Sequence, residues 1–384
     1  MDLDELRPWL TTWRLPGIGP VAFQTILEAF GEPAAYLAAT PSEGRRRGLD
    51  EKIAEAVAGQ QAVQAGVDQD LAWLEAADDR HILTLADPAY PAQLRHIADP
   101  PAVLFVRGRL EALGEPQLAM VGTRNASQSG SDTAADFARH LATTGLVITS
   151  GLALGIDAVA HRGALDAGGQ TIAVMGTGPE RLYPRDNHGL AHAIAEQGAV
   201  ITEMPTGTPM DRGLFPRRNR LISGLSVGVL VVEAGAQSGA LQTSQRAVEQ
   251  NREVFAIPGS IHSPLARGCN QLIQNGAKLV TAAQDVVDEL RHVQGVDLQK
   301  TAAPDALAID ASAAGGGDWI DEDPAYGALL DAMGYDPIGF DTLAERVGLT
   351  PDILSSMLLS LEMYGYVESS HGGRYTRIRH RAGG

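Results

Sequence analysis

The sequence predicts an α/β protein with a doubly wound parallel sheet, preceded by a small helical domain and followed by a winged helix. Three observations lead to this fold class. Six apolar runs of strand length lie between residues 117 and 290, helical stretches separate most of them, and the pattern changes to short helices outside this region. The chain has 384 residues, 44% of them hydrophobic, which is enough to bury cores in two or three units.

Residues 1–100 are expected to form the helical N-terminal domain, because apolar residues such as Leu3, Leu6 and Leu10 recur at helical spacing. Two of its helical pieces are joined by the turn Gly17-Ile18-Gly19. A Gly-x-Gly turn between helices lets backbone N–H groups approach a phosphate, as in helix-hairpin-helix modules. A tight connection that merely requires glycine is the commoner reason for such a turn, so both interpretations stay open.

Residues 101–292 are expected to form a Rossmann-like domain. Its six predicted strands are almost continuously apolar, which is typical of a parallel sheet covered on both faces. The predicted strands are residues 118–121, 146–149, 171–175, 199–202, 227–232 and 254–257. In such sheets ligands bind beyond the carboxyl ends of the strands, so the functional residues are expected there.

Residues 293–320 are predicted to be a linker, because they are rich in Ala, Gly, Ser and Asp and show little periodicity. Residues 321–384 predict a winged helix. Its expected elements are helices at 324–333, 338–347 and 351–364 and a hairpin centred on 371–373.

The third helix of this winged helix is not basic. Residues 351–364 include Asp352 and Glu362 but no Lys or Arg, whereas a DNA-reading helix would need basic side chains. A protein-contact or packing role is therefore at least as well supported for this helix as a role in DNA binding.

Charge is distributed unevenly along the chain. The formal net charge of -17 argues at first against nucleic acid, because affinity for phosphate comes mainly from Lys and Arg. Residues 117–290, however, carry 13 basic and 15 acidic residues, and residues 211–220 contain four arginines and one aspartate. The acidic total therefore does not exclude a nucleic-acid site in the central domain.

The first predicted strand is followed by an expected anion site. Gly122, Thr123 and Arg124 supply a free backbone, a hydroxyl and a guanidinium just before a helix whose N-cap is expected at Ser127. A plain strand-to-helix turn with a solvent-facing arginine is the alternative. The third strand ends in another glycine-containing loop, with Gly176 and Gly178.

A basic helix is predicted after the fourth strand. Guanidinium groups beside an aromatic ring and an amide could hold phosphates while the ring stacks on a base, as single-stranded nucleic acid requires. The residues are Phe215, Arg217, Arg218, Asn219 and Arg220. A solvated basic face with the phenyl ring in the core is an equally good interpretation of these residues alone.

The fifth strand leads into a further helix N-terminus, where Ser238, Gly239 and Thr243 offer N–H groups and hydroxyls to the same crevice. Glu203 and Glu233 end the fourth and fifth strands. A hydrolase could use such a carboxylate pair, and a binding protein could use it to hold its own loops.

The second strand leads into Gly151 and then into Asp157 and His161, which share one helix face. These two could form an acid/base pair, although helix capping and a packed histidine are commoner. The glycine spacing here is not that of a dinucleotide site, which disfavours a nicotinamide or flavin. The single cysteine, Cys269, excludes an internal disulfide and a cysteine-based zinc cluster. No cofactor or metal is expected.

The sequence also predicts where the protein works. No apolar stretch approaches the roughly 18 to 20 residues of a membrane-spanning helix, and the acidic start lacks the features of a secretory signal. One cysteine fits a reducing compartment. A cytoplasmic protein is therefore expected.

Taken in order, these motifs resemble the DNA-processing protein A family, also called Smf. The matching segments are Val121-Gly122-Thr123-Arg124, Ser150-Gly151-x-Ala153-x-Gly155-Ile156-Asp157-x-x-Ala160-His161, Tyr183-Pro184-x-x-Asn187, Phe215-Pro216-x-Arg218-Asn219-Arg220-x-Ile222, Val232-Glu233-Ala234, Ser238-Gly239-x-Leu241-x-Thr243, Pro258-Gly259, Gly268-x-Asn270 and Leu272-Ile273. The resemblance covers about residues 100 to 290, and the flanking helical domain and winged helix fit the order of domains in the full-length family.

The resemblance implies a cytoplasmic, non-enzymatic homodimer that binds single-stranded DNA and helps to load the RecA recombinase during natural transformation. By the family pattern, Arg124, Arg218, Asn219 and Arg220 contact the DNA backbone and Phe215 lies beside the bases. The family pattern thus favours the DNA-binding interpretation of the loops. Many members carry Ser where this chain has Thr123, but the hydroxyl is retained, so phosphate binding is expected to survive.

Two other classes of function are alternatives to DNA binding. A related sheet serves nucleoside-phosphate-hydrolysing enzymes, which have a Gly-Gly-x-Gly-Thr loop and a following glutamate, whereas residues 236–243 here have neither. A scaffold that mainly binds proteins is the other. The DNA-binding hypothesis predicts that Arg124→Ala and Arg218→Ala each weaken single-strand binding and lower its salt dependence without unfolding the chain.

Overall fold

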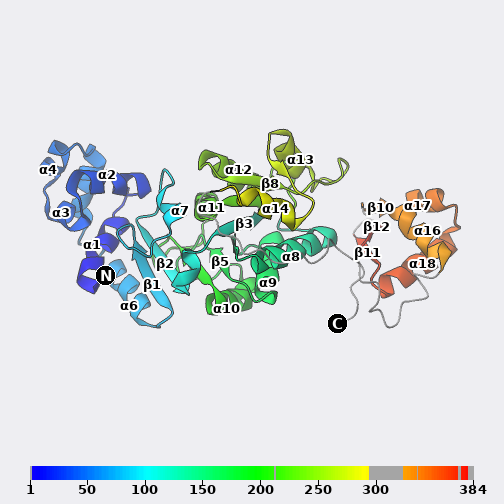
Figure 1. Cartoon of the computed structure of the whole chain (residues 1–384). Coiled ribbons are helices and arrows are strands. Elements are labelled where there is room, and N and C mark those ends of the chain that lie inside the picture. Colours follow the sequence, from blue (N-terminus) through cyan, green and yellow to red (C-terminus); the bar gives the residue numbers. More distant parts are fainter. Residues whose placement is uncertain (1, 212, 294–322, 335, 371–372, 379–384) are drawn as a thin grey trace.

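The computed structural model describes residues 2–211, 213–293, 323–334, 336–370 and 373–378 (Figure 1). Its centre is a mostly parallel sheet, which in the described residues has nine strands in the order β1-β2-β6-β5-β4-β3-β7-β8-β9. The strands are β1 (Arg80–Thr84), β2 (Val103–Gly108), β3 (Gln117–Val121), β4 (Val147–Ser150), β5 (Thr171–Val174), β6 (Ala199–Thr202), β7 (Gly228–Val231), β8 (Glu253–Ala256) and β9 (Lys278–Leu279).

All six strands predicted from the sequence are present, as β3 to β8, and they pair in parallel. From β3 the chain first adds β4, β5 and β6 on one side, and it then adds β7, β8 and β9 on the other. This reversal makes β3 and β7 a topological switch point, where open α/β sheets place their ligands. The prediction of a doubly wound α/β sheet is confirmed.

The strands alternate between two cores because successive side chains point to opposite faces. Leu118 and Met120 join one core and Ala119 and Val121 the other. The first face is covered by α8 (Gln128–Thr143), α9 (Ile156–Asp166), α10 (His188–Gln197) and α14 (Ala283–Leu290). The second is covered by α7 (Ala92–Arg95), η2 (Leu110–Leu113), α11 (Leu214–Leu225), α12 (Gly239–Glu249) and α13 (Arg267–Gln274), and η3 (Arg185–Asn187) precedes α10.

The N-terminal helices pack around a separate core and against the edge of the sheet (Figure 1). They are α1 (Leu3–Arg14), α2 (Pro20–Phe30), α3 (Pro33–Ala38), α4 (Pro41–Arg46), α5 (Glu51–Ala56), η1 (Val57–Gly59) and α6 (Gln64–Glu75). Trp13 joins the two regions because its Nε1–H donates to the Glu203 carbonyl oxygen at 2.9 Å. Arg14 binds Asp70 at 2.6 Å and also donates to the Thr206 carbonyl oxygen, so it fastens the domain to the chain after β6.

One part of the region expected to be helical is a strand. Residues 80–84 form β1, which pairs antiparallel with β2, and β2 pairs antiparallel with β6. The sheet therefore begins before residue 100, where the Rossmann-like domain was expected to start. Phe105 of β2 packs its ring on Trp73 at 5.6 Å between centroids, so this hairpin is stabilised by the helical domain beside it.

The C-terminal domain has its own core and a three-stranded sheet in the order β10-β12-β11. Its elements are α16 (Pro324–Met333), β10 (Ile338–Gly339), α17 (Phe340–Val347), α18 (Pro351–Met363), β11 (Val367–Ser370) and β12 (Arg374–Arg377). The predicted winged helix is confirmed, with Gly348 as the left-handed cap that ends α17. The predicted linker and the tip of the hairpin at His371-Gly372 lie largely or wholly outside the described residues.

Across the described residues, none of the helices has the length and apolar character needed to cross a membrane.

Candidate nucleic-acid interface

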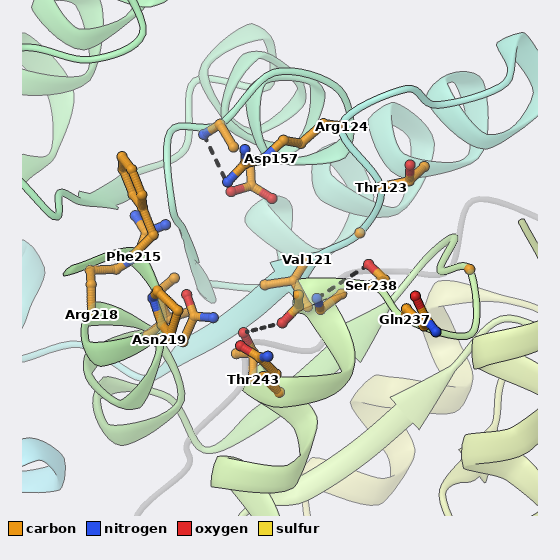
Figure 2. Close-up of a pocket in the computed structure, with 18 of the residues that line it drawn as sticks. Val121, Thr123, Arg124, Asp157, Phe215, Arg218, Asn219, Gln237, Ser238 and Thr243 are labelled. Atoms are coloured by element: carbon orange, nitrogen blue, oxygen red, sulfur yellow. Dashed lines mark hydrogen bonds between the residues drawn. The ribbon is translucent and has the colours of Figure 1, made fainter. Parts of the chain in front are cut away.

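A crevice of about 790 Å³ opens at the switch point, beyond the carboxyl ends of β3 and β7. Its walls come from the loops after β3 and β4, from α11 and from the start of α12 (Figure 2). The sequence predicted functional residues at the strand ends, and the structure has this crevice there. The site therefore follows from the topology of the sheet.

The loop Gly122-Thr123-Arg124 is held by its neighbours on both sides. The Thr123 N–H donates to the Glu233 carbonyl oxygen at 2.8 Å, and the Thr123 carbonyl oxygen accepts from the Ile156 N–H at 3.1 Å. Gly155 has a φ of 74°, and a Cβ there would lie 2.3 Å from the Thr123 oxygen. Glycine at 155 is therefore required for the second loop to support the first.

The Glu233 side chain anchors the start of α8 behind this loop. Its two carboxylate oxygens accept from the Ser127 N–H at 3.0 Å and from the Ser127 hydroxyl at 2.6 Å. The same hydroxyl oxygen accepts from the Gly130 N–H, so Ser127 is the N-cap that the sequence predicted. Glu233 is not among the residues that line the crevice. It acts on the site through the loop that it fixes.

Arg124 and Phe215 face each other across the crevice. The guanidinium carbon lies 5.9 Å from the centroid of the phenyl ring, and the centroid of the Tyr183 ring lies 5.7 Å from the same point. Arg124 is exposed, and within the described chain it has no hydrogen bond or ion pair. An exposed cation beside two aromatic rings suits a phosphate and an adjoining base.

Arg218 has a different environment. Its side chain is 5% exposed, and its Nη1–H groups donate to the carbonyl oxygens of Gly151, at 2.6 Å, and Val174. A Cβ at residue 151 would lie 2.6 Å from this guanidinium, which explains the glycine. Burial lowers the pKa of Arg218 to about 10, so the group stays charged at neutral pH.

Asp157 is the carboxylate that compensates this buried charge. It accepts from the N–H groups of Gly151 at 3.1 Å and Ala153 at 3.3 Å, and burial raises its pKa while Arg218 opposes the rise. Arg218 and Asp157 therefore organise the loop after β4 as well as lining the crevice. The expectation that Arg218→Ala leaves the fold intact stays a prediction, and truncation would leave the carbonyl groups of Gly151 and Val174 without this donor.

The start of α12 forms the opposite wall. Ser238 is its N-cap, and its hydroxyl oxygen accepts from the Ala240 N–H at 3.3 Å. Gln237, Gln242 and Thr243 line the crevice next to it, together with Val121 at the end of β3. The positive end of the helix dipole thus points toward the space that Arg124 enters from the other side.

Nine of the fourteen residues expected from the sequence line this crevice. They are Gly122, Thr123, Arg124, Phe215, Arg218, Asn219, Ser238, Gly239 and Thr243. Lining residues outside that set include Asp157, Tyr183, Gln237 and Gln242. These four residues could have been predicted from the sequence, because each is a polar or aromatic residue next to a loop at a strand end.

The other five expected residues are not part of the crevice wall. Gly151 lies beneath Arg218, and a Cβ at Gly176 would lie 3.2 Å from the Phe215 ring, so both glycines make room for site residues. Gly178 is packed against Pro205 and Glu180. Arg217 and Arg220 line a second, smaller cavity because they project from another face of α11.

The remaining titratable candidates are also engaged within the fold. Glu203 is 1% exposed and binds Arg220 at 2.5 Å, and burial raises its pKa against the opposing effect of Arg220. His161 is fully buried, with Nδ1 2.6 Å from the Thr171 hydroxyl. Burial lowers its pKa to about 3. A packed neutral histidine therefore accounts for His161, as the commoner interpretation held.

No cluster of His, Cys, Asp and Glu in the described residues has the geometry to hold a metal ion. The crevice has instead the features of an anion-binding site in a doubly wound α/β sheet. It combines an exposed arginine, a buried arginine and the N-terminus of α12. The class of protein is therefore a doubly wound α/β domain with this candidate anion crevice, preceded by a helical domain and followed by a winged helix.

Comparisons with known proteins agree with this class. The DNA recombination-mediator protein A family matches residues 81–291, the DprA-like N-terminal HHH domain matches residues 4–65 and the DprA winged helix domain matches residues 302–373. The protein Smf of Escherichia coli is 41% identical over 82% of this chain and 81% of its own length. The DNA processing protein DprA of Streptococcus pneumoniae is 45% identical over 55% of this chain and 78% of its own.

Two solved structures are similar. The X-ray structure of DNA processing protein A from Streptococcus pneumoniae aligns with a TM-score of 0.64 and 38% identity, over 72% of this chain and 95% of that one. A Helicobacter pylori DNA processing protein A, described for its single-stranded DNA binding mode, aligns with a TM-score of 0.50 and 28% identity, over 55% and 95%. This chain belongs to the DNA recombination-mediator protein A family, also known as DprA or Smf.

Proposed function

We propose that this protein binds single-stranded DNA in the crevice between α11 and α12, protects it, and loads RecA recombinase onto it during natural transformation. The observation that carries the binding step is the pairing of Arg124 with Phe215 at the mouth of an anion-binding crevice. A phosphate contact and a stacking surface side by side are the usual equipment for an unpaired strand. The Helicobacter pylori relative, described for single-stranded DNA binding, supports the same ligand.

The proposal is a binding role without catalysis, because the carboxylates in and near the crevice are already engaged by other groups of the protein. Among the described residues that line the crevice, Asp157 is the only acid, and it is engaged by two backbone N–H groups. Glu233 is bound to Ser127 and Glu203 to Arg220. The nucleotide-hydrolysing alternative would need a carboxylate that is free to reach a substrate.

The proposal extends to a cytoplasmic homodimer that hands the strand to RecA. These parts rest on membership of the family. A dimer would place two crevices on one assembly, and two linked sites on the same strand raise the overall affinity through effective concentration.

Two measurements test the proposal. Fluorescence anisotropy with a labelled oligothymidine and its duplex should give tighter binding to the single strand, and the affinity should fall as salt rises. Filament formation by RecA on a strand already covered with single-strand-binding protein should then speed up when this protein is added. Equal affinity for duplex and single strand would argue against the crevice as a site for unpaired DNA, and an unchanged RecA rate would remove the loading step alone.

A further inference from the structure

A second cavity, of about 120 Å³, lies between α11, α12 and the start of α2. It contains a concentration of arginine side chains that the proposed crevice does not use. The residues that line it are Pro20, Asp99, Pro216, Arg217, Arg220 and Arg246. We call this cavity the arginine cavity.

The arginine cavity lies on the same seam between α11 and α12 that forms the main crevice. Pro216 lines both spaces, so the two cavities meet at the first turn of α11. On α12, Gln242 and Thr243 line the crevice and Arg246 lines the arginine cavity. Residues three and four apart lie on one side of a helix, so Arg246 stands one turn beyond the crevice wall. A strand that leaves the crevice over Pro216 therefore meets the arginine cavity next.

The charges in the arginine cavity suit an anion. Arg217 is exposed and has no ion pair with any described residue, and Arg246 is 55% exposed, with Glu249 as its neighbour at 2.7 Å. Arg220 is 7% exposed, and its Nη1 has no hydrogen-bond partner in the described residues. Forked guanidinium groups match the oxygens of a phosphate, and an unmet buried donor favours a further acceptor.

The N-terminal domain closes one side of the arginine cavity. Pro20 is the first residue of α2, and its N-cap, Gly19, has no side chain to satisfy the N–H groups of the first turn. The Gly17-Ile18-Gly19 turn is thereby brought to the seam between α11 and α12. Gly17 has a φ of 83°, as a tight connection requires, and Gly19 begins a helix whose N-terminus lies beside the arginine cavity.

We propose that the arginine cavity holds a backbone phosphate of the DNA strand that occupies the crevice. This second contact rests on the proposed function, because it needs a strand already bound between Arg124 and Phe215. Arg217 and Arg246 supply the outer contacts and Arg220 the buried one. The strand then runs along the α11–α12 seam toward the helical domain, and its total length of contact exceeds that of the crevice.

The test uses the full-length protein and a length series of labelled oligothymidines from about 4 to about 16 nucleotides. The variant is Arg217→Gln with Arg246→Gln, since both side chains are exposed and their removal leaves the core intact. Short oligonucleotides that fill only the crevice should bind as they do to the wild type. For long ones, the slope of log affinity against log salt should fall by about 0.7 for each phosphate that the variant no longer binds.

Two further variants sharpen the result. Arg139→Gln is the matched control, because Arg139 is paired with Asp136 three residues away, as Arg246 is with Glu249, and lines neither cavity. Asp99 binds the Nε of Arg220 at 3.1 Å and places a negative charge in the arginine cavity. Asp99→Asn should therefore tighten the binding of long strands only.

The outcomes separate this inference from the proposed function. Loss of affinity at all lengths in the double variant, or no change at any length, would overturn the phosphate site. Weaker binding by Arg124→Ala in the same experiment would still support the crevice. Absence of binding by the wild type at every length would instead overturn the proposed function. A loss of affinity equal to that of Arg139→Gln would mean that only the overall electrostatic field of the protein had changed, which would also overturn the phosphate site.

Discussion

The guanidinium carbon of Arg124 lies 5.9 Å from the centroid of the Phe215 ring, across a crevice at the switch point of the sheet. The two residues are 91 positions apart and come from the loop after β3 and from the first turn of α11. Their approach depends on Gly155 and Gly176, which leave room for the loop and for the ring. A cation and an aromatic face are thereby offered to one ligand.

Phe215→Leu should weaken binding of single-stranded DNA without changing its salt dependence. The leucine keeps an apolar side chain but removes the face on which a base stacks, and such stacking contributes about 1–3 kcal/mol per base. Anisotropy titrations at two salt concentrations measure both quantities, and Phe215→Tyr should restore most of the affinity. A reduced salt slope for Phe215→Leu would indicate that the ring positions Arg124 and does not contact the bases itself.

Arg218→Ala should lower the stability of the protein. The buried guanidinium donates to the carbonyl groups of Gly151 and Val174, and a buried acceptor left without its partner costs about 1–3 kcal/mol. Urea unfolding followed by circular dichroism gives the change in free energy, with Arg124→Ala as the control that should unfold like the wild type. If Arg218→Ala had the same free energy of unfolding as the wild type, the buried guanidinium would not stabilise the fold.

Glu233→Gln should weaken DNA binding although Glu233 does not line the crevice. Both carboxylate oxygens accept hydrogen bonds from Ser127, and an amide offers a donor in place of one acceptor. The loop that carries Arg124 should then lose its fixed position. Electrostatics alone predicts tighter DNA binding for Glu233→Gln, because removal of a negative charge favours an anionic ligand. Tighter binding in an anisotropy titration would therefore contradict the positioning role.

His161 should make the fold sensitive to mild acid. The Thr171 hydroxyl donates to the Ile148 carbonyl oxygen, so His161 Nδ1–H must donate to Thr171, and Nε2 is buried without a partner in the described residues. Burial lowers the pKa of His161 to about 3 from 6.5, so the unfolded chain binds the proton first as pH falls. The stability from this group is present above pH 6.5 and is lost below it.

For one such group the loss between about pH 7 and about pH 5.5 is about 1.2 kcal/mol in the free energy of unfolding. His161→Asn keeps a donor near the position of Nδ1 and removes the titration. Urea unfolding at the two pH values should give a smaller acid-induced loss for the variant than for the wild type. Identical losses would mean that His161 does not titrate on unfolding as described.

The sequence predicted the central sheet well because its strands are buried on both faces and read as apolar runs, as Leu118–Val121 does. It missed β1 and β9 at the two edges of the sheet, and β2 next to β1. β1 reads as mixed polar and apolar sequence, Arg80–Thr84, and β9 has only two residues, whereas β2 is itself an apolar run. The place of β1 and β2 depends on packing against Trp73 and the other helices of the N-terminal domain. Contacts of this kind leave no periodic signal in β1.

The candidate site was predicted in the same uneven way. Arg124 and Phe215 follow strand ends, which the rule for α/β sheets identifies. The four arginines of residues 211–220 read alike in sequence, yet the structure buries Arg218 and Arg220 on different faces of α11 and leaves Arg217 exposed. Which face each takes depends on buried partners, Asp157 and Glu203, that are distant in the sequence.

The central claim is that the crevice binds unpaired DNA through Arg124. The most direct test is a titration of labelled oligothymidine with wild type and Arg124→Ala at about 50 and about 200 mM salt, with Arg139→Ala as the surface control. The account predicts weaker binding for Arg124→Ala and a salt slope smaller by about 0.7, since the variant neutralises one phosphate fewer on the single strand. Unchanged affinity and slope for Arg124→Ala, beside strong binding by the wild type, would contradict it.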